Sequence, residues 1–111
     1  MNQYWEIWYA GARKGFMLQK LERVFGKKAI SILESSGELS GRKINILKFE
    51  LELSGTDWSH SVLESLAIAE KLNHSWSVSG VTYGEICATG SEEGYEVSDI
   101  VYASWKLYKA T

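Results

Sequence analysis

Apolar and polar residues alternate along several stretches of this chain, which is the pattern of strands that bury one face and expose the other. The clearest stretch is Ile44–Leu53, where apolar residues alternate with Lys48, Glu50 and Glu52. Weaker alternation predicts four further strands, over Tyr4–Ala10, Ala29–Leu33, Trp76–Ala88 and Ser98–Lys109. Gly80 and Gly84 interrupt the fourth of these five segments, so we expect a bent or bulged strand there.

Two other stretches have apolar residues at helical spacing. The first helix is expected near residues 14 to 25 and ends before Gly26, a residue suited to the C-terminal cap. The second has an apolar stripe made by Val62, Leu63, Leu66, Ala67, Ala69 and Leu72. Ser61 with Glu64 has the spacing of a capping box, although Asp57 or Ser59 are also suitable N-caps.

The predicted order of elements is β-α-β-β-α-β followed by one added C-terminal strand. We therefore expect an α+β protein with a ferredoxin-like arrangement, in which two helices cover one face of an antiparallel sheet. The turn between the second and third strands is expected at Ser35–Gly37, and the added strand should pair with the strand before it. At 111 residues, we expect residues 1–111 to form a single α+β domain.

Aromatic residues exceed what one face of such a sheet can bury. In the first strand, alternation places Trp5 on one face and Tyr4 and Trp8 on the other, so some of these rings must point away from the helices. The last strand has the same property, with Tyr102 and Tyr108 opposite its apolar face. The stems of Lys and Glu can cover such rings, a second subunit can, or the rings can form a binding surface.

Charge is distributed unevenly although the net charge is only −2. The segment Arg13–Lys28 carries six basic residues and one acid, whereas the segment from Glu85 to Asp99 carries five acids and no Lys or Arg. Carboxylates around an aromatic residue can steer the protein toward a basic cleft and anchor it there. The expected partner-binding residues are therefore Glu92, Glu93, Tyr95, Glu96 and Asp99, with a second patch at Asp57 and Trp58 if the loops share one edge.

Catalytic and ligand-binding motifs are scarce. His60, His74 and Cys87 stand apart in the sequence, and neither a metal site nor a cofactor is expected. The loop Gly11–Gly15 precedes a helix and carries two cations, but its spacing differs from that of a phosphate-binding P-loop. The order of elements is also that of RNA-recognition modules, although the expected third strand presents acids where that family has basic and aromatic residues.

Composition narrows the class of protein. A pI near 5.7 argues against generic binding to nucleic acids or anionic membranes. We expect a cytoplasmic protein, because no secretory signal or membrane span is evident and Cys87 is the only cysteine.

These features together favour a non-catalytic protein-binding module. The most concrete form is a small inhibitor or immunity protein that blocks a basic active site, such as that of a nuclease toxin. The alternative is a homodimeric ferredoxin-like protein that binds a small molecule or acts as an enzyme. Its pocket would be lined by Trp8, Tyr102 and Tyr108, with proton chemistry from His60 or His74. An RNA-binding domain is the third interpretation.

Overall fold

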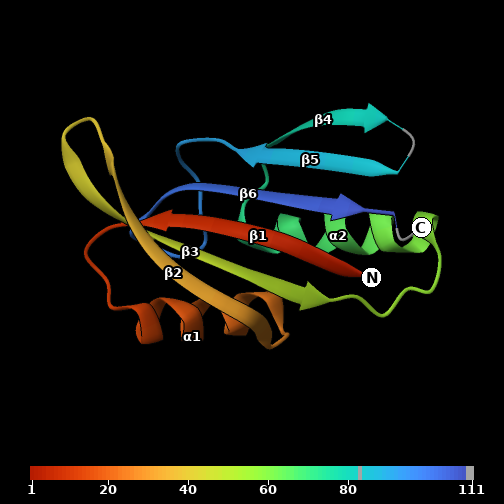
Figure 1. Ribbon diagram of the computed structural model, residues 1–111, viewed down its shortest axis with the longest axis horizontal. Helices are drawn as coiled ribbons and strands as arrows, with labels where there is room; N and C mark the ends of the chain where they lie inside the picture. Colours follow the sequence, from red (N-terminus) through yellow and green to blue (C-terminus); the bar gives the residue numbers. More distant parts are fainter. Residues whose placement is uncertain (83, 110–111) are drawn as a thin grey trace.

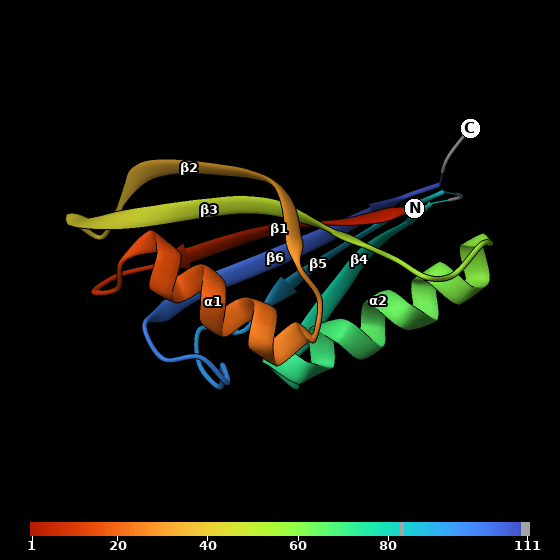
Figure 2. The same ribbon diagram turned by 90° about the horizontal axis from the view of Figure 1, so that it is seen from below.

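The computed structural model describes residues 1–82 and 84–109, which form one antiparallel sheet and two helices. The elements are β1 (Asn2–Tyr9), α1 (Lys14–Phe25), β2 (Ala29–Leu39), β3 (Arg42–Glu52), α2 (Trp58–Leu72), β4 (Trp76–Thr82), β5 (Glu85–Gly90) and β6 (Ile100–Tyr108). The strand order is β2-β3-β1-β6-β5-β4 (Figure 1). Both helices lie on the same face of the sheet (Figure 2), so the predicted α+β class and the one-sided helical cover are confirmed.

The ferredoxin-like order with one added strand is not confirmed, because the sheet has six strands in a different order. The segment expected as one bent strand over Trp76–Ala88 forms two antiparallel strands, β4 and β5. Gly84 has a φ of 100°, a backbone conformation that suits a turn, and Tyr83 lies outside the described residues. The final strand β6 pairs with β5, as expected, but its other edge pairs with β1, so it lies inside the sheet.

The β2–β3 hairpin is longer than predicted. Its turn lies at Ser40 and Gly41, not at Ser35–Gly37, and Leu39 pairs with Arg42. Both turn residues have positive φ, 52° and 78°, as a two-residue turn that matches the twist of the strands requires. In Figure 2 this hairpin rises above β1 and β6 on the side away from the helices.

The core lies between the sheet and the helices. Its side chains include Met17, Leu21 and Phe25 from α1, and Ile68 and Leu72 from α2. On the central strands of the sheet, the buried residues are Trp5, Ile7 and Tyr9 of β1 and Ile100, Ala103, Trp105 and Leu107 of β6, together with the polar Gln3. A register shift against β1 accounts for the even-numbered Ile100.

The apolar stripe expected on α2 is only partly buried. Leu63 is 66% exposed and Leu66 is 37% exposed, whereas Ser61 and Ser65 are fully buried. The small serines face the sheet at a close approach, where the side-chain amide of Gln3 donates a hydrogen bond to the carbonyl oxygen of Ser65 (3.1 Å). Packing distance, not hydrophobicity alone, therefore decides which face of α2 is buried.

Neighbouring residues on β6 should differ sharply in their effect on stability. Leu107 is fully buried and Tyr108 is 44% exposed on the opposite face. We expect Leu107→Ala to lower the free energy of unfolding by about 2–5 kcal/mol, because it leaves a cavity in the core. Tyr108→Ala should cost about 1 kcal/mol, mostly through its lost aromatic contact. Urea denaturation of both variants measures the difference, and equal losses would contradict the register of β6.

Candidate functional site

We call the face of the sheet opposite the two helices the open face, because no helix among the described residues covers it (Figure 2). On the two central strands, β1 and β6, it includes Tyr4 opposite Lys106, Glu6 opposite Ser104 and Trp8 opposite Tyr102. On β3, the residues opposite the same three positions of β1 are Glu50, Lys48 and Ile46. The prediction that one of Trp5 and Trp8 faces away from the helices is confirmed, since Trp5 is buried in the core and Trp8 lies on the open face.

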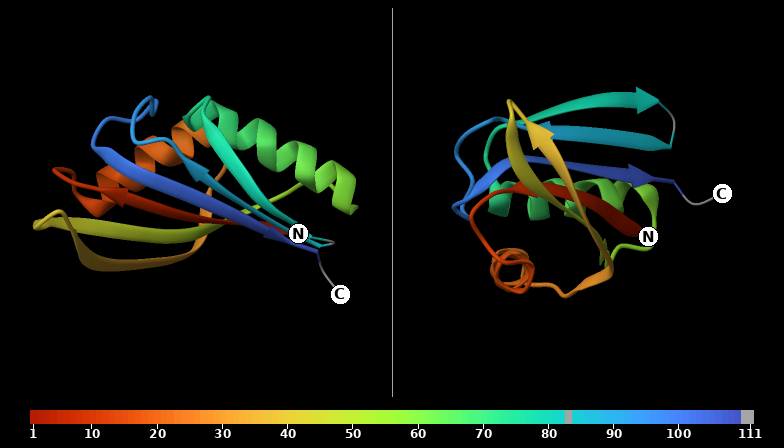
Figure 3. Two further views of the ribbon diagram at one scale, coloured as in Figure 1. Left: turned by 90° about the horizontal axis from the view of Figure 1, so that it is seen from above. Right: turned by 60° about the vertical axis from the view of Figure 1, so that its left-hand side comes forward.

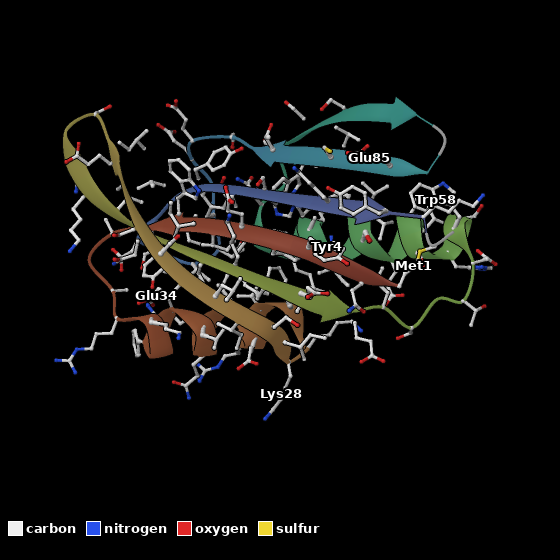
Figure 4. The ribbon with its side chains drawn as sticks, in the orientation of Figure 1. Met1, Tyr4, Lys28, Glu34, Trp58 and Glu85 are labelled. Atoms are coloured by element: carbon white, nitrogen blue, oxygen red, sulfur yellow. The ribbon has the colours of Figure 1, made fainter. Side chains whose placement is uncertain are left out.

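Four aromatic side chains of the open face form two pairs. The rings of Tyr4 and Tyr108 pack edge to face with centroids 5.6 Å apart, and those of Trp8 and Tyr102 pack in the same way at 5.5 Å. Tyr4, labelled in Figure 4, and Tyr108 are each 44% exposed. Edge-to-face packing holds the rings in defined orientations while leaving apolar surface accessible to a ligand or partner.

Glu6 links the charged and aromatic parts of this face. Its carboxylate accepts a hydrogen bond from the Trp8 indole Nε1–H (2.9 Å) and lies 3.5 Å from the Lys48 ammonium. Both charged side chains are partly exposed, so the ion pair adds little to stability. The main effect of Glu6 is to fix the orientation of the Trp8 ring through the indole hydrogen bond.

Two hollows lie on the open face. The first, of about 450 Å³, extends from Leu33 on β2 across Tyr4 and Lys106 to Cys87 on β5. The second, of about 670 Å³, has Trp8 and Tyr102 in its lining, together with Leu39 from the β2–β3 hairpin and Glu92. Glu6 and Tyr102 line both hollows, which are therefore adjacent. Both volumes fall in the range of ligand-binding pockets.

The β2–β3 hairpin contributes to the second hollow (Figure 3). The β2–β3 hairpin bends away from the helices at one end of the sheet. Leu39 and Ser40, at the tip of that hairpin, form one wall of the hollow. Ile100 and Val101, at the start of β6, also belong to its lining.

The acidic segment forms β5 and the loop between β5 and β6. Glu85 lies on the strand, and the four acids of the loop, Glu92, Glu93, Glu96 and Asp99, are all exposed. Of these four acids, Glu92 lines a hollow of the open face. The loop backbone is tied to the end of α2, because the Glu96 N–H donates to the Leu72 carbonyl (2.8 Å) and the Asn73 side chain donates to the Glu93 carbonyl (3.0 Å). The loop therefore presents its carboxylates from a fixed backbone.

Tyr95, expected as the aromatic anchor of this loop, is partly buried against the core. Its hydroxyl accepts a hydrogen bond from the backbone N–H of Ala103 on β6 (3.0 Å). Ala103 is next to Ser104, the last residue of β6 that pairs with β5. A side chain at Gly90 would collide with that hydroxyl. Burial raises the pKa of Tyr95, so the phenol stays protonated at neutral pH.

Asp57 and Trp58, the expected second patch, lie at the N-terminal end of α2, where Figure 4 labels Trp58. The loop after β5 is bonded to the opposite end of that 15-residue helix, about 22 Å away at 1.5 Å per residue. The two predicted patches therefore do not share one edge. The Asp57 carboxylate caps the helix by accepting from the His60 N–H (2.8 Å), and this hydrogen bond lowers the pKa of Asp57.

The residues considered for catalysis are not brought together. His60 contacts the Asp57 carboxylate and His74 lies beside Glu70, and neither histidine lines one of the two hollows. Cys87 does line the first hollow, but burial and the nearby Glu85 carboxylate raise the pKa of its thiol. The thiol is therefore protonated at neutral pH and is a weak nucleophile.

The described part of the chain has no metal-binding cluster and no membrane-spanning helix, and the start of α1 has no side-chain cap. No group of three or more His, Cys, Asp or Glu side chains there could hold a metal ion. None of the helices described is long and apolar enough to cross a membrane. In the Gly11–Gly15 loop, Arg13 is the N-cap of α1 and provides no side-chain cap.

Comparison with protein-family models, with curated proteins and with solved structures finds no match to this chain. The open face carries the aromatic pairs and both hollows described above. Residues that the sequence did not single out for binding, including Glu6, Lys48 and Leu39, belong to this face. For Glu6 and Lys48 the signal was present in the alternation, because both occupy the positions that point away from the core.

Removing only the Tyr95 hydroxyl tests whether this residue supports the fold. Tyr95→Phe leaves the Ala103 N–H without its partner, so we expect the free energy of unfolding to fall by about 1–3 kcal/mol. Glu93→Gln, an exposed change in the same loop, should stay within about 0.5 kcal/mol. Thermal denaturation of both variants measures these effects. Unchanged stability of the Phe variant would show that water replaces the hydroxyl.

Proposed function

We propose that this protein is a non-catalytic protein-binding module whose partner docks on the open face. The observation that carries this proposal is the two aromatic pairs on the central strands, which lie beside two adjacent hollows on a face that no helix covers. Large aromatic residues around a partly enclosed surface are the usual anchors of protein interfaces. The rigid sheet beneath them needs no reordering on binding, which lowers the entropic cost of association.

The narrower proposal is a small inhibitor or immunity protein that blocks a basic active site, such as that of a nuclease toxin. Glu92 joins the acidic loop to the open face, because it lines the same hollow as Trp8 and Tyr102. Glu93, Glu96 and Asp99 extend the negative surface beyond it. Such a surface would steer the protein toward a Lys- or Arg-rich cleft, where the aromatic residues then make the close contacts. The proposal places both proteins in the cytoplasm.

Exposed aromatic residues of the open face should be required for capture of the partner. We expect Tyr4→Ser combined with Tyr108→Ser to weaken binding at least about tenfold, as loss of interface anchors does. The matched control is Phe16→Ser with Leu63→Ser, which removes two exposed apolar side chains from the helices. Immobilised parent and variants are exposed to lysate of the source cell, and the retained protein is titrated. Loss of binding in the helix variant alone would place the interface on the other face.

The acidic loop should control the rate of association. Replacing Glu92, Glu93 and Glu96 with Gln removes three charges, so the on-rate with the captured partner should fall and depend less steeply on salt. The control Glu52→Gln, Ser54→Lys and Thr56→Lys changes the net charge equally at the other end of β1, beside Asn2. Surface plasmon resonance at several salt concentrations measures both. Equal on-rates and salt slopes for parent and loop variant would exclude steering by this loop.

A homodimer that encloses a small molecule is the second candidate, because both hollows have the volume of ligand-binding pockets. In that case a second copy would cover the open face and close the hollows. Sedimentation equilibrium separates the two candidates. A monomer at micromolar concentration would remove the homodimer, whereas a dimer that dissociates on Tyr4→Ser with Tyr108→Ser would favour it.

A further inference from the structure

The hollow beside Trp8 combines aromatic rings and carboxylates. Its lining includes the rings of Trp8 and Tyr102, the carboxylates of Glu6 and Glu92, and the apolar residues Leu39 and Val101. No Lys or Arg belongs to this lining in the part of the chain that the structure describes. Aromatic faces and carboxylates both attract positive charge, and they do so more strongly where water is partly displaced.

The two carboxylates differ in what already holds them. Glu6 accepts from the Trp8 indole and lies 3.5 Å from Lys48, so its charge is partly compensated. Glu92 is exposed and forms no ion pair with a described residue. Glu6 therefore positions the Trp8 ring, and Glu92 supplies the negative charge that a bound cation would neutralise.

From this arrangement we infer that the hollow binds the ammonium or guanidinium group of a Lys or Arg side chain presented by the partner protein. The inference rests on the proposed function and names the chemistry of its central contact. The aliphatic stem of the side chain packs on Leu39 and Val101, and its charged end lies against the Trp8 and Tyr102 rings and the Glu92 carboxylate. A protein side chain suits this hollow because the hollow continues into the aromatic floor of the open face, which a larger partner can cover.

Nuclear magnetic resonance provides a direct test without the natural partner. The probe is Nα-acetyl-lysine methylamide, and the control is the norleucine analogue, which has a similar stem and no charge. Among the five tryptophans, the Trp8 indole N–H signal should shift saturably with the lysine probe, with a dissociation constant in the millimolar range. The Trp58 signal should not move, because Trp58 lies at the N-terminal end of α2, whereas the loop that carries Glu92 is bonded to the C-terminal end of that helix.

Variants identify the charge that matters. Glu92→Gln should weaken binding of the lysine probe about threefold or more, and Tyr102→Leu should weaken it by a similar factor. Glu96→Gln, an exposed change in the same loop that lies outside the hollow, should leave the affinity unchanged. Since Glu92 is exposed, its variant stays folded and keeps the test decisive even if Tyr102→Leu does not fold.

The inference is overturned if the Trp8 signal does not respond, if the norleucine analogue binds as well as the lysine probe, or if Glu92→Gln binds like the parent. Tighter binding of tetramethylammonium than of the lysine probe would also overturn it, in favour of a free small cation. If the lysine probe binds but the open-face variants retain the partner, the proposed function fails and the cation site stands. If those variants lose the partner and the probe does not bind, only the cation site fails.

Discussion

The packing of aromatic rings around the Trp5 side chain is the interaction on which the rest of the structure depends. The Trp5 ring packs against Phe25 of α1, Phe49 of β3, Trp76 of β4 and Trp105 of β6, with centroids between 4.7 and 6.5 Å away. One residue of the central strand thus joins a helix to strands from both halves of the sheet. Because side chains alternate along β1, burying Trp5 on the helical side fixes Tyr4 and Glu6 on the other. The open face is therefore a direct consequence of how the core is packed.

Local alternation of apolar residues predicted the strands and their faces well. The odd-numbered residues of β1 from Trp5 to Tyr9 and of β6 from Ala103 to Leu107 are buried as expected, and the helices lie where the apolar spacing placed them. At the start of β6 the alternation does not hold, because a register shift against β1 buries Ile100 and leaves Val101 only partly buried. The order of strands in the sheet was not predictable, because no local pattern shows that β6 inserts beside β1. The turn at Gly84 was taken for a bend, since a glycine between two short apolar segments is compatible with either. On α2, the close approach of Gln3 buried Ser61 and Ser65 instead of Leu63 and Leu66.

The candidate site was predictable only in part, for a similar reason. Composition identified the acidic loop, and parity identified Trp8 and Tyr102 as outward residues. Leu39 and Ser40 join them and Glu92 in one hollow because the β2–β3 hairpin is long, and the sequence placed the turn of that hairpin several residues too early. Because Tyr95 lies among the acids of the loop in the sequence, it was expected to anchor a partner protein. Its hydroxyl instead accepts the hydrogen bond of the Ala103 N–H, and its ring packs against the core. Long-range packing decided each of these outcomes.

The central position of β6 also has a consequence for the order of folding. Gln3 pairs with Leu107, so one of the two edges of β1 acquires its partner only when segments from opposite ends of the described chain meet. The segment from β1 to β3 can form its hairpin and dock α1 earlier, through contacts that are closer in sequence. Until β6 arrives, β1 presents an unpaired edge, and the rings that surround Trp5 are incomplete. Folding should therefore be limited by this last closure, and the intermediate before it is the state most prone to pair with another chain.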